Sequence, residues 1–274
     1  MTRDRRTRFF NGTVAHESLR GQVDATRFAF GTQMQVDVPV ADLRLDRSAP
    51  GLDRQILFGH PVCLLDADTG FVRDETTRYV GHVTPSALAP FGTPTHRVSA
   101  RTTLCFSRPD FKTPDPMPLS CGALAPVLET VGQFARIGEN RYVPSHHLTP
   151  VEKPQPDLST TAELLRGTPY LWGGNSAMGI DCSGLVQLAA QAAHLPCPGD
   201  SDQQLKQLGA EVPPGTPPKR NDLMFWKGHV ALLYDASTLI HANAHAMAVA
   251  LEPLADAMAR IAQTDGPVLA HKRL

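Results

Sequence analysis

The pattern of apolar and polar positions is most regular in the stretch that begins at Cys182. Apolar residues there recur every three or four positions, which predicts a helix with one face buried against a core. That face is formed by Leu185, Leu188, Ala189, Ala192 and Leu195. Asp181 is a good N-cap residue, so we expect Cys182 to lie in the first turn of the helix.

Related patterns mark further elements from Ser159 to the last residue. Thr160 with Glu163 and Ser201 with Gln204 have capping-box spacing, which indicates the starts of two helices. The predicted elements are helices over residues 159–166, 201–208 and 254–261, and strands over residues 223–226, 229–234, 239–241 and 267–273. Helices mixed with strands in one segment favour an α+β domain over residues 159–274.

Residues 34–90 and 95–148 carry a different pattern, in which short apolar runs are broken by Asp, Gly and Pro. Short strands at this spacing predict two small β-barrels. Segments 78–83 and 141–144 both begin with Arg-Tyr-Val, which indicates an internal repeat. The Pro-rich residues 108–118 lie between predicted strands, so we expect them to form a loop within the second barrel.

The remaining segments are an N-terminal stretch and a connection. Residues 1–33 are the least informative, although residues 14–21 are predicted to form a short helix that stops at a glycine. Three prolines in residues 149–158 favour an extended, semi-rigid linker to the last domain.

Composition narrows the function classes. The chain has 274 residues, 42% of them hydrophobic, and can therefore bury more than one core. A formal net charge of -1 argues against nucleic acid as a partner. Apolar runs are too short to predict a membrane span, and the first residues lack the apolar region of a secretory signal. We therefore expect a cytoplasmic protein.

Cysteine and histidine positions give no sign of a disulfide framework or a metal site. The cysteines are Cys63, Cys105, Cys121, Cys182 and Cys197, an odd number without CxxC spacing. Closely spaced histidines occur at His146 with His147 and at His241 with His245, and their spacing matches no metal-ligand pattern. We predict reduced thiols, no metal and no cofactor, with His245 on an exposed loop.

Cys182 is the candidate nucleophile. At the start of a helix, unpaired amide groups and the helix dipole stabilise a thiolate. Gly173, Gly174 and Gly179 lie just upstream and allow the backbone to turn tightly beside a ligand. The alternative is a buried structural cysteine, which is the commonest role of a free thiol.

Two histidines provide the partners that a thiolate needs. His229 begins an apolar strand and His241 ends the next one, and a short turn between the strands would place the two side by side. The expected roles are His229 as the base that takes the thiol proton and His241 as the group that orients its ring.

The order TPYLWGG, GIDCSGLVQ, GDSDQQ, NDLMFWKGHV and LIHAN over residues 159–274 resembles the NlpC-type cell-wall peptidase family, which has a papain-like fold. The resemblance implies that Cys182 is the nucleophile, His229 the base and His241 the third polar residue. It also implies an oxyanion hole made by the Tyr170 hydroxyl and the Cys182 amide. Trp226 is expected in the core or the cleft wall.

The resemblance further implies a set of substrate contacts. Asp181 would bind the free amine of the first substrate residue, while Ser183 and Ser201 would hold the α-carboxylate of D-glutamate. Capping alone would also explain Asp181 and Ser201, and both roles can coexist. The loop before residue 201 would face the cleft at Asp200, and Trp172 would pack beside Tyr170.

The two predicted barrels resemble bacterial SH3-type domains in segments such as ILFGHPV and YVGHVTPSAL. We expect the first barrel to close one end of the cleft, with a carboxylate and Tyr79 facing the substrate. The candidate carboxylates are Asp66, Asp68, Asp74 and Glu75. The alternative for both barrels is a purely structural role.

The function implied by the resemblance is hydrolysis of the bond between γ-D-glutamate and a diamino acid in murein peptides, through an acyl-thioester. We expect a cytoplasmic monomer that recycles short peptides with a free N-terminal L-Ala. The residues leave open a general cell-wall hydrolase, an amidase or acyl transferase on the same scaffold, and a non-catalytic wall-peptide binding module. They do not distinguish diaminopimelate from lysine.

Overall fold

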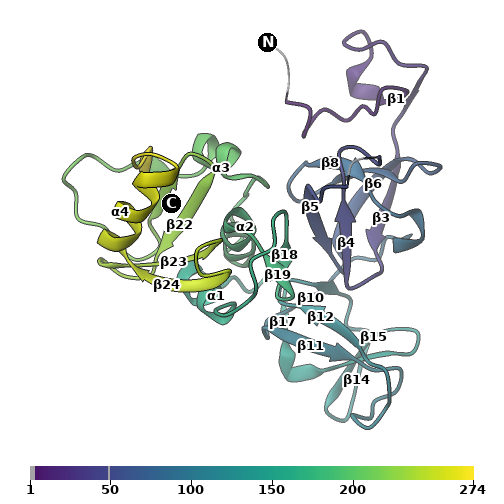
Figure 1. The fold of residues 1–274 in the computed structure, drawn as a ribbon. Coiled ribbons are helices and arrows are strands. Elements are labelled where there is room, and N and C mark those ends of the chain that lie inside the picture. Colours follow the sequence, from purple (N-terminus) through teal and green to yellow (C-terminus); the bar gives the residue numbers. More distant parts are fainter. Residues whose placement is uncertain (1–3, 49) are drawn as a thin grey trace. The chain divides into compact units, whose positions relative to one another are not determined.

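The computed structural model describes residues 4–48 and 50–274, which divide into two compact units, Met1–Lys153 and Pro154–Leu274 (Figure 1). The boundary falls inside the Pro-rich segment 149–158. Each unit has its own sheets and its own buried core, so each is described separately below.

The chain first forms a small parallel pair of strands, β1 (Val14–His16) and β2 (Arg27–Ala29). A single 3-10 turn, η1 (Glu17–Leu19), follows β1. The helix predicted over residues 14–21 is therefore wrong for its first half. Val14 and Ala15 are buried and pair with β2, and this tertiary contact overrides their weak helical pattern.

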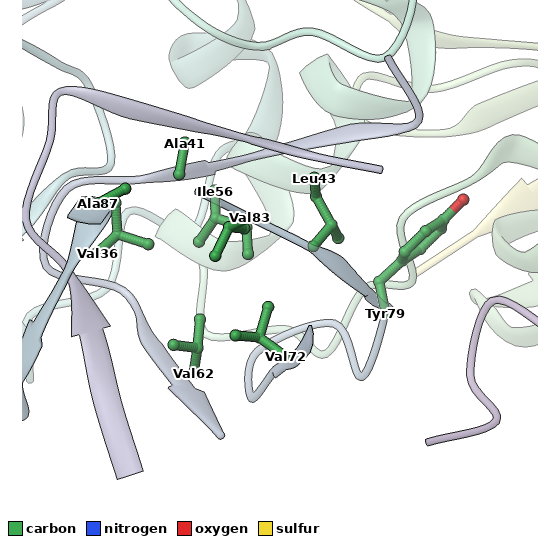
Figure 2. Packing of buried hydrophobic residues seen from close by; sticks show 9 residues of the cluster. All are labelled: Val36, Ala41, Leu43, Ile56, Val62, Val72, Tyr79, Val83 and Ala87. Atoms are coloured by element: carbon green, nitrogen blue, oxygen red, sulfur yellow. The ribbon is translucent and has the colours of Figure 1, made fainter. Parts of the chain in front are cut away.

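The first unit continues with an antiparallel five-stranded sheet in the order β8-β7-β6-β3-β9 and a separate hairpin of β4 and β5. Their bounds are β3 (Thr32–Val36), β4 (Val40–Leu43), β5 (Arg54–Leu57), β6 (Pro61–Asp66), β7 (Phe71–Asp74), β8 (Val80–His82) and β9 (Leu88–Pro90). Buried aliphatic side chains from these strands and from the residues between β8 and β9 form one cluster, with Tyr79 at its border and its hydroxyl directed away (Figure 2). The apolar runs of this segment thus form strands as predicted.

A second set of strands follows in the same unit. They are β10 (His96–Val98), β11 (Thr102–Cys105), β12 (Met117–Ser120), β13 (Leu124–Ala125), β14 (Glu129–Val131), β15 (Phe134–Gly138), β16 (Arg141–Pro144) and β17 (Leu148–Pro150). They pair as β13-β10-β17, β11-β12 and β14-β15-β16. Residues 108–116 lie in the connection between the paired strands β11 and β12, which confirms the predicted loop except for its last two residues, Met117 and Pro118, which belong to β12.

The two sets share a pattern. In each, a strand leads into a 3-10 turn and a last short strand: β8, η2 (Pro85–Ala87) and β9 in one, and β16, η3 (Ser145–His147) and β17 in the other. In each, the last strand pairs with the first, β9 with β3 and β17 with β10. The described residues nevertheless form separate open sheets and no closed barrel, so the likeness to SH3-type domains stays a prediction.

The second unit is built on a six-stranded sheet in the order β20-β25-β21-β22-β23-β24, antiparallel throughout. The strands are β20 (Ala210–Glu211), β21 (Leu223–Trp226), β22 (His229–Leu233), β23 (Thr238–Asn243), β24 (Ala248–Pro253) and β25 (Ala270–Arg273), with a hairpin of β18 (Asn175–Ser176) and β19 (Gly179–Ile180) outside the sheet. The helices are α1 (Leu158–Leu164), α2 (Cys182–Ala192), α3 (Ser201–Gln207) and α4 (Leu254–Thr264). The α+β prediction for this domain is confirmed.

Helix α4 covers one face of this sheet. Ala257 and Ile261 on α4 pack with the side chains of Met224, Trp226, Ala231, Leu233 and Leu239. Trp226 is therefore a core residue, which is one of the two predicted positions, the core and the cleft wall. Within the described residues, none of the helices is long and apolar enough to cross a membrane.

Helix ends differ from the predicted ones because other groups act as caps. Asp157, not Thr160, caps α1, by accepting from the backbone amides of Ser159 and Thr160. Helix α2 ends at Ala192, and His194 takes a left-handed conformation with φ of +61°, which stops the helix before Leu195. Leu195 therefore lies outside the buried face on which the periodicity placed it.

Candidate active site

Cys182 is the first residue of α2, and Asp181 is its N-cap. The Asp181 carboxylate accepts from the Gly184 amide at 2.6 Å with one oxygen and from the Gly173 amide at 3.0 Å with the other. The predicted cap is thus confirmed, and the same side chain also ties the Gly-rich loop to the start of the helix. Cys182 itself is buried, with 6% of its surface exposed.

A tight turn brings the next strand pair to the cysteine. Trp226 at the end of β21 pairs with His229 at the start of β22, so only Lys227 and Gly228 connect the strands. Gly228 has φ of +75°, a conformation that other residues rarely adopt. Its carbonyl oxygen lies 4.0 Å from the Sγ of Cys182, so the thiol contacts the residue that directly precedes His229.

The two histidines meet as the sequence predicts. His229 on β22 and His241 on β23 lie with Nε2 of the first 2.8 Å from Nδ1 of the second. Their ring centroids are 5.1 Å apart, and the buried Trp226 ring lies 5.7 Å from that of His229. The Nδ1 atom of His229 is the ring nitrogen that this hydrogen bond leaves for proton transfer.

Burial governs the charge of both rings. Desolvation, together with the positive field of His241 and Arg260, lowers the pKa of His229 from 6.5 to about 3. The pKa of His241 is also lowered, first by desolvation, while the nearby Glu252 carboxylate acts in the opposite direction. At neutral pH His229 is therefore an uncharged imidazole, the form that can accept a proton.

Two residues that the sequence reasoning missed complete this arrangement. The Nε2 atom of His241 lies 2.9 Å from a carboxylate oxygen of Glu252 on β24. Arg260 on α4 donates to both oxygens of that carboxylate, at 2.9 and 2.7 Å. An acidic residue at the end of a strand and an arginine in the next helix carry no local pattern that points to His241.

Tyr170 lies on the backbone beside the cysteine loop. It forms an isolated parallel bridge with Ile180, two residues before Cys182, and its amide donates to the Met247 carbonyl at 2.9 Å. The chain thus holds Tyr170 next to the segment that leads into α2. Its role in an oxyanion hole stays a prediction.

The predicted carboxylate-binding serines sit in different surroundings. Ser183 is buried, and its hydroxyl donates to Asp181 at 2.9 Å, so its proton is directed to a protein group and away from any substrate. Ser201 is the partly exposed first residue of α3, directly after Asp200, the N-cap residue. Both substrate assignments stay predictions, and Ser201 is the more accessible of the two serines.

Gln204 does not form the predicted capping box. Its side chain is buried, and its amide nitrogen donates to the carbonyls of Ser183 at 2.9 Å and Pro198 at 3.0 Å. The contact ties α3 to the first turn of α2, immediately beside Cys182. Sequence spacing pointed to Gln204 for the wrong reason, because a local and a long-range partner of a glutamine look alike in the sequence.

Several other predicted site residues have different environments. Trp172 has 71% of its surface exposed, so it does not pack as predicted, and His245 is exposed as expected. Tyr79 is 3% exposed and belongs to the core of the first unit, an environment that favours packing over substrate contact.

The four acidic candidates lie in the first unit, and three of them make local contacts. Asp66 accepts from Thr69, Asp74 from Thr77, and Glu75 pairs with Arg73 and Arg78. These carboxylates shape their own turns. Their role toward a substrate stays a prediction, as does that of Asp68.

The arrangement defines a class before any comparison is made. A thiol at the start of a buried helix, a neutral imidazole on the adjoining sheet and a second ring that orients the first are the parts of a thiol-dependent acyl-transfer site. The helix and the antiparallel sheet that carry these groups give the domain a papain-like architecture.

Comparison with known proteins agrees. The model of the NlpC/P60 family matches residues 167–264. The gamma-D-glutamyl-L-lysine dipeptidyl-peptidase of Bacillus subtilis (strain 168) is 36% identical over 93 residues, which are 31% of each chain. Dipeptidyl-peptidase 6 of Lysinibacillus sphaericus is 36% identical over 91 residues, 30% of each chain. The aligned part thus spans about a third of these relatives' length.

A solved structure extends the likeness in fold. The crystal structure of an NlpC/P60 family protein from Bacillus cereus ATCC 10987 has a TM-score of 0.72, with 19% identity, over 88% of this chain and 99% of that one. At this identity the match shows a shared fold. Residues 167–264 thus form an NlpC/P60 domain, in agreement with the shared fold.

Proposed function

We propose that the protein is a cysteine peptidase that hydrolyses the γ-D-glutamyl bond to a diamino acid in short murein peptides. The observation that carries the proposal is the contact of Cys182 with the turn of His229, joined to the 2.8 Å hydrogen bond between His229 and His241. A substrate of this class agrees with the name of the Bacillus subtilis relative, a gamma-D-glutamyl-L-lysine dipeptidyl-peptidase.

In the proposed reaction, Nδ1 of His229 takes the proton of the Cys182 thiol, and the thiolate attacks the γ-carbonyl carbon. The Tyr170 hydroxyl and the Cys182 amide would stabilise the resulting oxyanion. His229 then donates its proton to the leaving amino group of the diamino acid. Water hydrolyses the remaining thioester, releasing the dipeptide and restoring the thiol.

A free N-terminal amine is the proposed selection rule. The Asp181 carboxylate is nearly buried beside Cys182, and a substrate ammonium placed there would form an ion pair with it, whereas an acetylated amine carries no positive charge for such a pair. Ser201, and Asp200 at the same loop, would contact the D-glutamate α-carboxylate or its neighbours. Such a rule fits recycling of short peptides better than remodelling of an intact wall.

Mass spectrometry of cleavage products tests the proposal. The purified protein and Cys182→Ala would be incubated with L-Ala-γ-D-Glu-meso-diaminopimelate, its lysine counterpart and the N-acetylated form of each. We expect release of the diamino acid from the free peptides only, and none with Cys182→Ala. Comparison of the two free peptides identifies the preferred diamino acid.

Each other outcome points to a different function. Equal cleavage of free and acetylated peptides would overturn the amine rule and indicate a general cell-wall hydrolase. A product joined to an added amine would indicate an acyl transferase. Binding of the peptide without any cleavage would indicate a wall-peptide binding module.

A further inference from the structure

The hydrogen bonds of the candidate site continue beyond the two histidines. They run from Nε2 of His229 to Nδ1 of His241 at 2.8 Å, and from Nε2 of His241 to Glu252 at 2.9 Å. This line of hydrogen bonds ends at Arg260, which donates to both carboxylate oxygens of Glu252. Four side chains from β22, β23, β24 and α4 are thus connected in one line.

The sheet register explains why these groups meet. Glu252 pairs across from Leu239, and His241 lies two residues beyond Leu239, so both side chains project from the same face of the sheet. Helix α4 covers that face, with Ala257 and Ile261 in the core and Arg260 between them in the chain. The His241 side chain is fully buried, whereas that of Glu252 is 16% exposed.

The Glu252 carboxylate determines which atom donates and which accepts in each hydrogen bond of the line. An ionised carboxylate only accepts, so Nε2 of His241 must carry the proton and donate to Glu252. A neutral His241 then has a bare Nδ1, which accepts from Nε2–H of His229. A neutral His229 with its proton on Nε2 has a bare Nδ1, the atom required to take the thiol proton.

We propose that Glu252, held by Arg260, is a positioning residue that sets the proton positions on His241 and His229, an inference that rests on the thiol chemistry of the proposed function. When the proton of Cys182 moves to Nδ1 of His229, the ring becomes a cation with protons on both nitrogens. The carboxylate stabilises that charge through His241 without accepting the proton itself.

The titratable and charged groups around His241 are Glu252 on β24, Arg260 on α4, His229 on β22 and His245 in the turn after β23. The Arg260 guanidinium lowers the pKa of the Glu252 carboxyl, chiefly through its hydrogen bond, so Glu252 is ionised at the pH at which a thiol reacts. Its role as a pure acceptor therefore persists across the neutral range.

A simpler role for Glu252 and Arg260 is to fasten α4 to the sheet. The chain offers a matched pair for this alternative: the buried Asp222 accepts from Arg273 with both oxygens, at 2.6 Å each, and lies 2.7 Å from Nε2 of His271. Asp222 precedes β21 at the end opposite Trp226, whose neighbour across the sheet is His229. This second cluster has the same chemistry without a place in the line to Cys182.

The test measures the reactivity of the Cys182 thiol, which does not depend on the identity of the substrate. The full chain and its variants Glu252→Gln, Arg260→Lys and Asp222→Asn would be treated with iodoacetamide over a range of pH, and alkylation of the Cys182 peptide followed by mass spectrometry. Nitrogen NMR of labelled histidine would report which ring nitrogen of His241 carries the proton.

We expect Glu252→Gln to slow alkylation of Cys182 at neutral pH by about tenfold or more, to shift its pH profile, and to mix the two tautomers of His241. Arg260→Lys, which keeps the carboxylate but cannot hold both of its oxygens, should shift the profile less and in the same direction. Asp222→Asn should lower the melting temperature and leave both readouts unchanged.

Two results would overturn the inference. One is an alkylation profile of Glu252→Gln that matches that of Asp222→Asn, and the other is an unchanged His241 tautomer in a folded Glu252→Gln protein. Failure of the proposed function looks different: the peptides would stay uncleaved while the thiol of the unmutated protein still showed its Glu252-dependent reactivity.

Discussion

Two clusters in the second unit each contain a carboxylate, an imidazole and a guanidinium, and they differ in what lies next to them. In one, Glu252 joins His241 to Arg260, and in the other, Asp222 joins His271 to Arg273. Among the described residues, His241 has a second imidazole as a hydrogen-bond partner, that of His229 beside Cys182, and His271 has none. Contact among a carboxylate, an imidazole and a guanidinium therefore does not by itself identify a functional site. The residue that the imidazole contacts next decides the role of the cluster.

Exchange of each histidine gives the largest expected difference between the clusters. His241→Ala should lower kcat/KM on the proposed peptide by roughly a thousandfold, because His229 loses the partner that orients it. His271→Ala should leave kcat/KM nearly unchanged, since its ring belongs to the other cluster. Steady-state kinetics of both variants decides this, and equal losses would show that the two clusters do not differ as described.

Acid should destabilise the fold through the first cluster before the second. His229 in the unfolded chain takes a proton near pH 6.5, but its pKa in the folded protein is lowered to about 3. The unfolded state therefore binds more protons between these values, and the free energy of unfolding should fall by on the order of a few kcal/mol as the pH drops through this window.

The Asp222 carboxyl has a pKa below the usual 3.8, although desolvation opposes its partners, so its stabilising effect is lost only at lower pH still. Urea unfolding at a series of pH values measures the dependence, with His229→Gln as the comparison. The variant should lose most of the slope between about pH 6 and pH 4. If the free energy of unfolding of His229→Gln still fell with pH in this range, groups other than His229 would be responsible for the dependence.

The second cluster should matter for stability alone. Asp222→Asn removes a buried charge that Arg273 and His271 contact, and should lower the free energy of unfolding by about 3 kcal/mol. Because the cluster lies away from the turn of His229, peptide cleavage measured well below the melting temperature should stay as it is. A large loss of cleavage in a folded Asp222→Asn protein would contradict the separation of the two clusters.

The smallest expected effect on stability concerns the cap of α2. Asp181→Ala removes the bond to the Gly184 amide and should destabilise the protein by about 1 kcal/mol. It also frees the Gly173 amide, so the Gly-rich loop loses its tie to the helix and cleavage should fall more than stability does. Asp181→Asn, which can keep the cap, separates the two contributions when melting temperature and kinetics are compared.

Local patterns predicted much of the second unit. The apolar period placed α2 and α4, an acidic residue before Cys182 marked the cap, and a short turn between apolar strands set His229 beside His241. These features depend on residues within a few positions of one another, or on a hairpin whose two strands are consecutive. Their physical causes are present in the sequence itself.

Other parts of the site could not be reached in this way. The Gln204 side chain, which spacing alone assigned to a capping box, instead holds the Ser183 carbonyl, and the Tyr79 ring packs in a core. Ser183 directs its hydroxyl proton to Asp181. Each of these side chains could form hydrogen bonds or packing contacts with several different partners, and the sequence does not show which partner it takes.

The sequence alone determined which residues could act: the thiol at a helix start, the two histidines, and the family motifs around them. The tertiary structure decided which of many acidic and basic side chains support them, because the sheet register places Glu252 beside His241 and α4 brings Arg260 to Glu252. Such contacts depend on how strands and helices pack. No local rule of period, cap or turn specifies that packing.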